Sequence, residues 1–218
     1  MLQVKTFVFN PYAENTLIIS TPAGEAAIID PGCYSASEQM QLDAYIEEQG
    51  LKPVLLLNTH GHIDHMLGNS YVVEKYQIPF WTHEIVIQEL ALAPAWGQGM
   101  GLSVSRSPDP DRRLKAGETF HLGEYELKVL FVPGHSPGHI AFYHAAGQQL
   151  FSGDVLFQGS IGRFDLPGGD FETLMRSIVE QLMTLEDEVR VYPGHGPETS
   201  IGAERQLNPF VKEYLGRR

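Results

Sequence analysis

Three histidines and one aspartate fall within six residues directly after a short apolar run. The run covers residues 53–57, and its unbroken hydrophobic character predicts a strand buried on both faces. His60 and His62 lie two apart, so in extended backbone they point in the same direction. Gly61 between them has no Cβ and lets the chain approach an ion closely. Because imidazole and carboxylate clusters are the usual ligands of zinc and related ions, this segment predicts a metal centre.

Asp64 and His65 begin a helical pattern, in which Asp64 suits the N-terminal end of the helix. Adjacent residues at a helix start diverge, so these two side chains can serve a second point in space while His60 and His62 serve the first. The pattern therefore predicts two metal sites side by side. The alternative, unrelated loop histidines and caps, does not account for so many ligand-type side chains in one turn.

Three further predicted strands also end in a glycine-adjacent side chain that can bind a metal, namely His135, Asp154 and His195. Loops at strand ends are where a sheet protein builds a site. We expect one site made of three imidazoles, from His60, His62 and His135. We expect a second, mixed site made from Asp64, His65 and His195. Asp154 carries two oxygens and can bridge both ions, which leaves a shared position for a solvent ligand.

The composition limits the kinds of partner and site. A chain of 218 residues is long enough for one large domain, and we expect a single domain over residues 1–218. The formal net charge of −12 argues against nucleic acid as a partner. Cys33 is the only cysteine, which excludes an internal disulfide and a thiolate metal cage. No segment reaches the roughly 18–20 apolar residues of a membrane span, and no export signal is visible, so we expect a cytoplasmic protein without a membrane partner.

The remaining pattern predicts strands alternating with helices. Residues 2–29 predict an antiparallel meander that ends at Asp30, whose carboxylate could orient a metal-bound imidazole or simply cap its turn. Helical spacing is found in four segments, residues 38–49, 83–92, 170–183 with Asp170 as a cap, and 204–215. Residues 93–114 show no clear period and predict either a lid or substrate wall carrying Trp96 and Met100, or a variable surface excursion.

The combined motifs resemble those of the metallo-β-lactamase fold superfamily over essentially the whole chain. They are residues 60–65 (HGHIDH), 133–135 (PGH), 153–154 (GD) and 194–195 (GH). The resemblance implies an α/β fold, described as α+β in some schemes, in which a four-layer αββα sandwich carries the metals at one edge of its sheets.

Within that superfamily, residues 133–139 (PGHSPGH) and 159–163 (GSIGR) are similar to the hydroxyacylglutathione hydrolases, also called glyoxalase II. This resemblance implies a dinuclear metal-dependent hydrolase that cleaves S-lactoylglutathione, or a related small-molecule acyl thioester. Two divalent ions, zinc above all and otherwise iron or manganese, would lower the pKa of a bridging water to give hydroxide near neutral pH. Asp64 would orient this hydroxide, and Asp154 would complete the catalytic pair of carboxylates.

The chain departs from that family in its substrate region. Glyoxalase II carries an additional helical C-terminal region, whereas this sequence stops at Arg218. Arg163 stands where the family has a glutathione-binding lysine, and could instead form a surface salt bridge. Asp165 and Pro197 stand where the family has tyrosines. The motifs are thus similar to a compact glyoxalase II-like branch, in which we expect His139 to support a ligand or the turn rather than to bind metal.

Two other functions fit parts of the pattern. An iron-dependent persulfide dioxygenase of the same fold would retain the same histidines and aspartates, and both metals accept such ligands. A metal-stabilised binding module without catalysis would have closed four-coordinate sites, whereas seven convergent ligands for two ions leave room for water and substrate. The ligand count therefore favours an enzyme.

Overall fold

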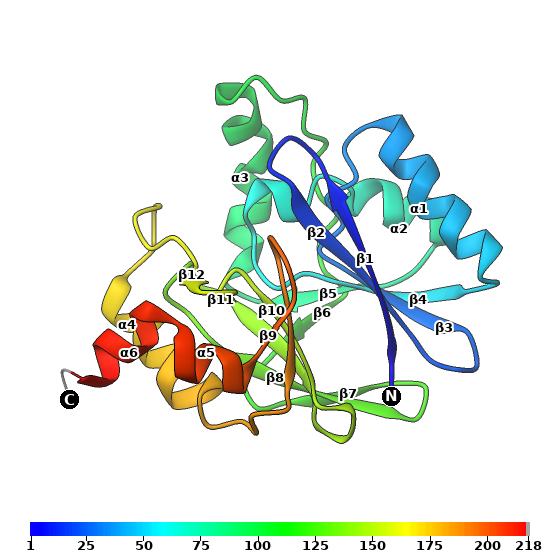
Figure 1. The fold of residues 1–218 in the computed structure, drawn as a ribbon. Coiled ribbons are helices and arrows are strands. Elements are labelled where there is room, and N and C mark those ends of the chain that lie inside the picture. Colours follow the sequence, from blue (N-terminus) through cyan, green and yellow to red (C-terminus); the bar gives the residue numbers. More distant parts are fainter. Residues whose placement is uncertain (217–218) are drawn as a thin grey trace.

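The computed structural model describes residues 1–216 and shows two β-sheets packed face to face, each covered by helices on its outer side (Figure 1). The first sheet contains, in spatial order, β1 (Gln3–Phe9), β2 (Glu14–Ser20), β3 (Glu25–Ile29), β4 (Lys52–Leu57), β5 (Phe80–His83) and β6 (Arg112–Leu114). The second contains, in spatial order, β14 (Thr199–Ser200), β13 (Arg190–Pro193), β10 (Gln149–Gly153), β9 (Ile140–His144), β8 (Tyr125–Phe131) and β7 (Thr119–Leu122). The expected meander is confirmed, because β1, β2 and β3 pair antiparallel in sequence order.

Helices from the two halves of the chain cover opposite faces of this sandwich (Figure 1). Those beside the first sheet are α1 (Ala36–Glu48), α2 (Asn69–Tyr76) and α3 (Val86–Gly99). Those beside the second are α4 (Phe171–Ser177), which continues as the π-helical segment Ile178–Leu182, α5 (Ile201–Leu207) and α6 (Pro209–Gly216). Short elements are the 3-10 turns η1 (Ile63–His65) and η2 (Ala145–Gly147), and the ribbon of β11 (Leu156–Phe157) and β12 (Ser160–Ile161). Within residues 1–216, no helix has the length and apolar character needed to cross a membrane.

Three apolar clusters fill the three spaces between these layers. Ile29 and Leu57 lie in the cluster between the two sheets, together with Phe142 of the second sheet. Their neighbours Ile28 and Leu56 lie in the cluster under α1, α2 and α3. Successive side chains of a strand point to opposite faces, so the unbroken apolar runs are explained by burial on both faces. A third cluster lies between the second sheet and the later helices, and the expected four-layer αββα arrangement is confirmed.

The expected end of the third helix is wrong. α3 runs to Gly99 instead of ending at residue 92, and Pro94 lies inside it. Residues 112–114 form β6, so only residues 100–111 of the predicted 93–114 loop connect regular elements. The buried positions Val86, Leu90, Ala93 and Gly97 follow a helical period, but the glycines and the proline obscured that period in the sequence.

Two other boundaries also differ from the expected ones. Residues 204–215 do not form one closing helix, because α5 ends before Asn208 and α6 starts at Pro209, and a residue before proline is disfavoured in helical conformation. The helix expected to begin at Asp64 begins at Asn69, after the separate turn η1. The cap at Asp170 is confirmed, since its Oδ1 accepts a hydrogen bond from the Thr173 backbone N–H at 2.8 Å.

Parallel pairing places the functional loops at one edge of the sandwich. β3 pairs parallel with β4, and β10 pairs parallel with β13. The carboxyl ends of parallel strands meet at the same edge, where open sheets build their sites. The loops that follow these four strands carry Asp30, the segment 58–65, Asp154 and His195.

Replacement of Phe142 by alanine is expected to destabilise the sandwich. Phe142 is fully buried in the cluster between the sheets, so its loss leaves a cavity that costs about 3–5 kcal/mol of unfolding free energy. Urea denaturation followed by circular dichroism measures this difference. Val8→Ala, which truncates an exposed side chain of β1, is the control and should change stability by less than about 0.5 kcal/mol.

Candidate metal centre

The structure brings His60, His62 and His135 together. One ring nitrogen from each lies within 4.8 Å of the others. The ring centroids of His62 and His135 are 4.4 Å apart, and those of His60 and His62 are 4.7 Å apart. His60 and His62 reach this point from the turn after β4, and His135 from the turn after β8. These are the three imidazoles that the sequence assigned to one group.

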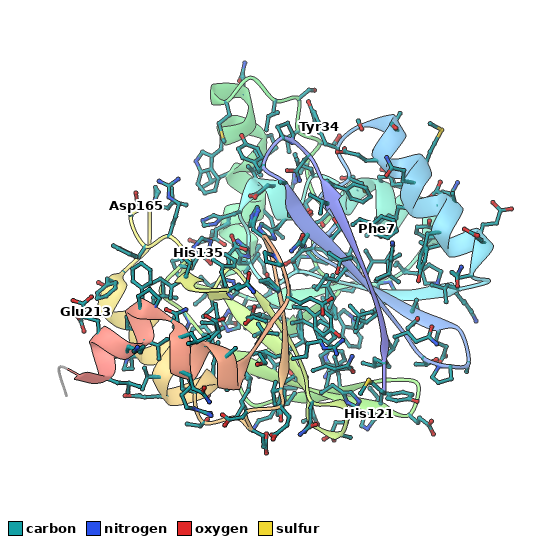
Figure 2. The ribbon with its side chains drawn as sticks, in the orientation of Figure 1. Phe7, Tyr34, His121, His135, Asp165 and Glu213 are labelled. Atoms are coloured by element: carbon teal, nitrogen blue, oxygen red, sulfur yellow. The ribbon has the colours of Figure 1, made fainter. Side chains whose placement is uncertain are left out.

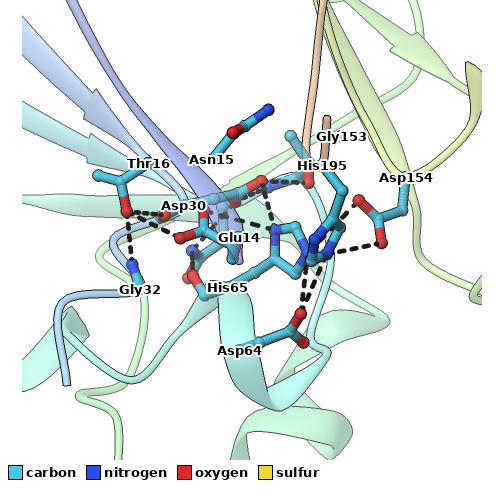
Figure 3. A network of polar contacts seen from close by, with 12 residues as sticks. Glu14, Asn15, Thr16, Asp30, Gly32, Asp64, His65, Gly153, Asp154 and His195 are labelled. Carbon is cyan, nitrogen blue, oxygen red and sulfur yellow. Dashed lines mark hydrogen bonds and ion pairs between the residues drawn. The ribbon is translucent and has the colours of Figure 1, made fainter. Parts of the chain in front are cut away.

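A second group beside the first contains Asp64, His65 and His195. The Nε2 atoms of His65 and His195 are 3.3 Å apart. Asp64 Oδ2 lies 3.1 Å from His195 Nε2 and 3.6 Å from His65 Nε2 (Figure 3). His65 is fully buried and His195 is partly exposed, so this group opens toward solvent on the His195 side.

Asp154 contacts both groups, and Figure 3 shows its carboxylate beside His65 and His195 of the second. Its Oδ1 is 3.4 Å from His65 Nε2, and its Oδ2 is 3.5 Å from the Nε2 atoms of both His135 and His195. Gly194 permits this approach, because a Cβ at that position would collide with Asp154 Oδ1. One carboxylate therefore faces imidazoles of both groups, which is the position expected of a bridging ligand.

Backbone carbonyls fix the orientation of two of these rings. His135 Nδ1 is 2.7 Å from the carbonyl oxygen of Arg163, and His195 Nδ1 is 3.2 Å from that of Ala13. A carbonyl oxygen only accepts, so in this network Nδ1 carries the proton in both rings. Nε2 is then the unprotonated nitrogen, and it is the Nε2 atoms that face Asp154.

Asp30 fixes His65 in the same way. Its Oδ2 accepts from His65 Nδ1 at 3.3 Å and from the Thr59 hydroxyl at 2.6 Å, while its Oδ1 accepts from the Thr59 backbone N–H at 2.7 Å. Asn58 Nδ2 is 3.2 Å from Oδ1. Thr59 Oγ1 in turn lies 2.9 Å from His60 Nδ1. Asp30 thus orients one imidazole directly and a second through Thr59, which goes beyond capping its own turn.

The nitrogen and oxygen atoms that these contacts leave without a hydrogen-bond partner suit a divalent ion. His60 Nε2, His135 Nε2 and Asp154 Oδ1 are buried and have no hydrogen-bond partner among the described residues. Unpartnered buried polar atoms are costly, and native structures contain few of them. Neutral imidazole nitrogens and carboxylate oxygens are the ligands that zinc, iron and manganese accept. The residues present therefore fit a metal centre of this class.

His139 lies beside the centre, but its Nε2 already accepts a hydrogen bond and is not free to bind an ion. This Nε2 accepts a hydrogen bond from the Asp154 backbone N–H at 3.1 Å. Its ring is stacked on that of His60 with centroids 4.6 Å apart. His139 therefore holds the loop of Asp154 against the His60 ring.

Arg163 lies outside the two groups, and only its carbonyl oxygen contacts them. Its guanidinium makes two hydrogen bonds to the carboxylate of Asp165, at 2.9 and 3.0 Å, and both side chains are exposed. Figure 2 shows Asp165 on the outer part of the segment between β12 and α4, with His135 deeper in the molecule. The geometry thus contains the surface salt bridge that the sequence left as an alternative for Arg163.

Two acidic residues beside the centre were missed by the sequence analysis. Glu14 is fully buried, and its Oε1 lies 3.9 Å from His65 Nδ1. Glu89 of α3 accepts a hydrogen bond from the Gly61 backbone N–H at 3.1 Å, and so holds the chain between His60 and His62. Neither residue has a glycine-flanked strand-end pattern, so no sequence signal separates them from the other acidic residues.

Burial and charge give the groups of the centre different affinities for protons. Burial lowers the pKa of His60 and His139 well below that of free imidazole, and lowers that of His62 to about 3. Burial alone would also lower the pKa of His65, but the carboxylates of Asp154 and Asp64 raise it well above its usual value. Burial alone would raise the pKa of Asp154, but the neighbouring His65 outweighs it, so this pKa lies well below its ordinary range.

Comparison with known proteins identifies the family. The sequence profile of the metallo-beta-lactamase superfamily matches residues 10–195. The chain belongs to the metallo-β-lactamase superfamily. A probable metallo-hydrolase of Bacillus subtilis, YqgX, is 41% identical over 87% of this chain and 89% of its own length. The hydroxyacylglutathione hydrolase GloC of Haemophilus influenzae is 36% identical over 96% of this chain and 98% of its own length.

Solved structures of the metallo-β-lactamase superfamily share the whole architecture. The B3 metallo-beta-lactamase BLEG-1 superposes with a TM-score of 0.89 at 33% identity, over 96% of this chain and 99% of its own. TTHA1623, solved in a di-iron-bound form, superposes with a TM-score of 0.84 at 39% identity, over 94% of this chain and 99% of its own. These similarities support a metallo-hydrolase that binds divalent metal.

Acidification is expected to destabilise the metal-free protein. Imidazoles with a lowered pKa, such as His60, His62 and His139, stay neutral in the folded chain but are protonated on unfolding below about pH 6.5. Their stabilisation is complete above that pH and is lost as the pH falls. Glu14 and Glu89, whose pKa values burial raises, offset part of this proton uptake.

The unfolding free energy of the metal-free protein should therefore fall most steeply between about pH 5 and 4, where unfolded glutamates are also protonated and the offset from Glu14 and Glu89 fades. There the expected slope is more than about 1.4 kcal/mol per pH unit, equivalent to net uptake of more than one proton. Urea titrations at a series of pH values, with chelator present, measure the slope. A profile that is flat or rises toward acid would show that these histidines are not buried as neutral groups.

Proposed function

We propose that this protein is a dinuclear metal-dependent thioesterase of the glyoxalase II-like type, which cleaves S-lactoylglutathione or a related acyl thioester. The observation that carries the proposal is the pair of adjoining ligand groups with Asp154 between them. Seven side chains converge there. A closed structural site uses only four ligands per ion, so two ions that share seven side chains keep positions for water and substrate.

The residues that would hold the ions follow from the two groups. One ion would be held by His60, His62, His135 and Asp154. The other would be held by Asp64, His65, His195 and Asp154. Zinc is the metal that we propose first, with iron or manganese as alternatives, because all three accept imidazole and carboxylate. The di-iron form of the 39% identical TTHA1623 supports the use of two ions and keeps iron among the candidates.

When bound, such ions would lower the pKa of water and polarise the thioester carbonyl. The protein's own residues supply orientation. Asp30 and the carbonyls of Arg163 and Ala13 each hold one imidazole by Nδ1, so that Nε2 is the nitrogen turned toward the ion sites. Asp64 places a carboxylate oxygen beside two of these nitrogens, where we propose that it orients the attacking water and accepts its proton.

The reaction is a hydrolysis in which the oxygen of one water molecule bonds to the thioester carbonyl carbon and the carbon–sulfur bond breaks. The products are a carboxylate and a thiol, with release of one proton. A thiolate is a good leaving group, so the reaction needs no separate general acid to protonate it. Support for the thioester class comes from the 36% identity to GloC and from the motifs at residues 133–139 and 159–163.

The substrate-binding role of Arg163 remains a proposal. The guanidinium lies on the segment that also holds His135, and could contact an anionic thiol carrier if it released Asp165. The net charge of −12 supports a small molecule as the substrate, with no nucleic acid or membrane as a partner.

Metal content and activity measured on the same preparation test the proposal. Protein purified without added metal is analysed for its elements, then assayed for S-lactoylglutathione hydrolysis and for oxygen uptake with glutathione persulfide. Two ions per chain with thioester cleavage would support the thioesterase. A single iron with oxygen uptake would instead indicate the persulfide dioxygenase, and two bound ions without either activity would rule out glutathione as the thiol carrier while leaving the hydrolytic centre.

Loss of a proposed ligand should abolish hydrolysis and leave the chain folded. We expect His62→Ala and Asp154→Ala each to lower thioester hydrolysis by more than about 100-fold, which is more than the loss of a residue that only supports a ligand would cost. Each variant should also bind fewer than two ions per chain. His121→Ala, which removes an exposed histidine of β7, should leave both quantities unchanged. An active Asp154→Ala variant would contradict a ligand shared by both ions.

Asp30→Asn is expected to weaken metal binding without removing a ligand. Asparagine tolerates the φ of +49° at this position but cannot accept every hydrogen bond that the carboxylate receives from Thr59 and His65. Chelator competition should show a loss of about 10–100-fold in affinity for at least one ion. Asp43→Asn, which alters a carboxylate bonded to Tyr71 and Tyr76, is the control and should keep the original affinity.

A further inference from the structure

Helix α3 is apolar on two of its faces. Val86, Leu90, Ala93 and Gly97 are buried and face the core. Leu92 and Trp96 lie four residues apart and share another face, and Met100, the residue directly after the helix, continues their line; the three are 49%, 39% and 51% exposed. A helix of an ordinary surface turns charged and polar residues outward, so an outward apolar stripe indicates a binding surface.

The stripe meets a loop that also contacts the metal centre. The Sδ atom of Met100 lies 4.0 Å from the hydroxyl of Tyr12 in the loop between β1 and β2. Two other residues of that loop, Asn10 and Ala13, hold the second ligand group. Asn10 Nδ2 donates to the carbonyl of Asp64 at 3.0 Å, and Ala13 O accepts from His195 Nδ1.

The helix itself is fixed to the same loop of ligands. A Cβ on Gly97 would lie 3.1 Å from Ile63 Cδ1, so α3 packs closely against η1, which carries Asp64 and His65. Glu89 of α3 accepts a hydrogen bond from the backbone N–H of Gly61, in the turn that precedes η1. α3 and the Tyr12 loop therefore both pack against the segments that carry the ligands, and the stripe is a fixed surface beside those segments.

The charges around the centre indicate what kind of group this surface would take. The guanidinium of Arg163, the residue that would pair with an anionic carrier, is already bonded twice to Asp165. Leu92, Trp96 and Met100 offer no charged side chain to an anionic group. An uncharged apolar group is the complementary occupant of a surface made from Leu92, Trp96, Met100 and Tyr12.

We propose that this stripe binds the apolar acyl chain of the substrate, so that the preferred substrates are medium-chain acyl thioesters. The inference rests on the proposed thioesterase function and assigns its substrate class. From residue 92 to residue 100 the helix advances about 12 Å, enough to line an extended acyl chain whose carbonyl end reaches the metal centre. An acyl chain seated there leaves water and buries apolar surface on Trp96 and Met100.

A series of thioesters with one neutral thiol carrier tests the proposal. The zinc-loaded protein is assayed with acetyl-, butanoyl- and octanoyl-N-acetylcysteamine, and with S-lactoylglutathione. We expect kcat/KM to rise by about tenfold or more from acetyl to octanoyl, because each buried methylene adds binding energy in the transition state. Equal values across the series, with good hydrolysis of S-lactoylglutathione, would overturn the acyl-chain surface and leave the thioesterase standing.

Variants of the stripe residues test whether the stripe causes the preference for a longer acyl chain. Trp96→Ser and Met100→Ser should each lower the ratio of octanoyl to acetyl kcat/KM several-fold. Met40→Ser is the matched control, since Met40 is a 64% exposed methionine on α1, and it should keep the ratio of the parent protein. An unchanged ratio in both stripe variants would overturn the assignment.

A binding measurement separates this inference from catalysis. S-octyl-N-acetylcysteamine is a thioether that lacks the thioester carbonyl, so the protein does not hydrolyse it. We expect it to shift Trp96 fluorescence in the parent protein and in Trp81→Phe, and to have no effect in Trp96→Phe. If no thioester is cleaved but the thioether still shifts Trp96, the proposed function fails while the apolar site remains.

Light scattering tests the competing occupant, a second copy of the chain. A monomer in both the parent protein and Trp96→Ser is the expected result. A dimer that Trp96→Ser dissociates would show that the stripe is covered by another protomer, and would overturn the acyl-chain proposal.

Discussion

The position of Asp154 between two sets of imidazoles is the constraint on which the rest of the centre depends. Its carboxylate is buried and lies within 3.5 Å of three Nε2 atoms that come from three separate segments of the chain. Uncharged surroundings would raise the pKa of such a carboxyl group, whereas the nearby imidazoles keep it ionised. The strand ends that carry these groups can converge only because the two sheets pack with their functional edges together.

Ring orientation links the metal centre to distant parts of the fold. The carbonyl of Ala13 holds His195, although the two residues are 182 positions apart in the sequence. Arg163 holds His135 in the same way, and Asp30 holds His65. Each contact consumes Nδ1 and leaves Nε2 for a ligand role, so the fold decides which nitrogen of each ring is available.

Helix α3 connects this chemistry to substrate choice. Its inner face belongs to the core under the first sheet, its Glu89 holds the backbone between His60 and His62, and its outer stripe continues toward Tyr12. The loop is correspondingly short and covers residues 100–111. Trp96, which the sequence placed in a loop, is presented by the helix instead, and Met100 follows directly after its last residue. A fixed surface of this kind loses little conformational entropy when it binds a substrate.

The sequence by itself determined the layered α/β fold, the strand-end positions of the ligand-type residues and their division into two groups. The ligand positions and their grouping follow from local patterns, namely apolar runs, glycine-flanked histidines and spacing, whereas the layered fold was implied by the resemblance of the combined motifs to the superfamily. Only the tertiary structure decided the roles of Glu14, Glu89 and Thr59, and the extent of α3. These depend on burial and on contacts between distant segments, which no local pattern encodes, and in α3 the core packing of Ala93 and Gly97 outweighed the helix-breaking tendency of proline and glycine.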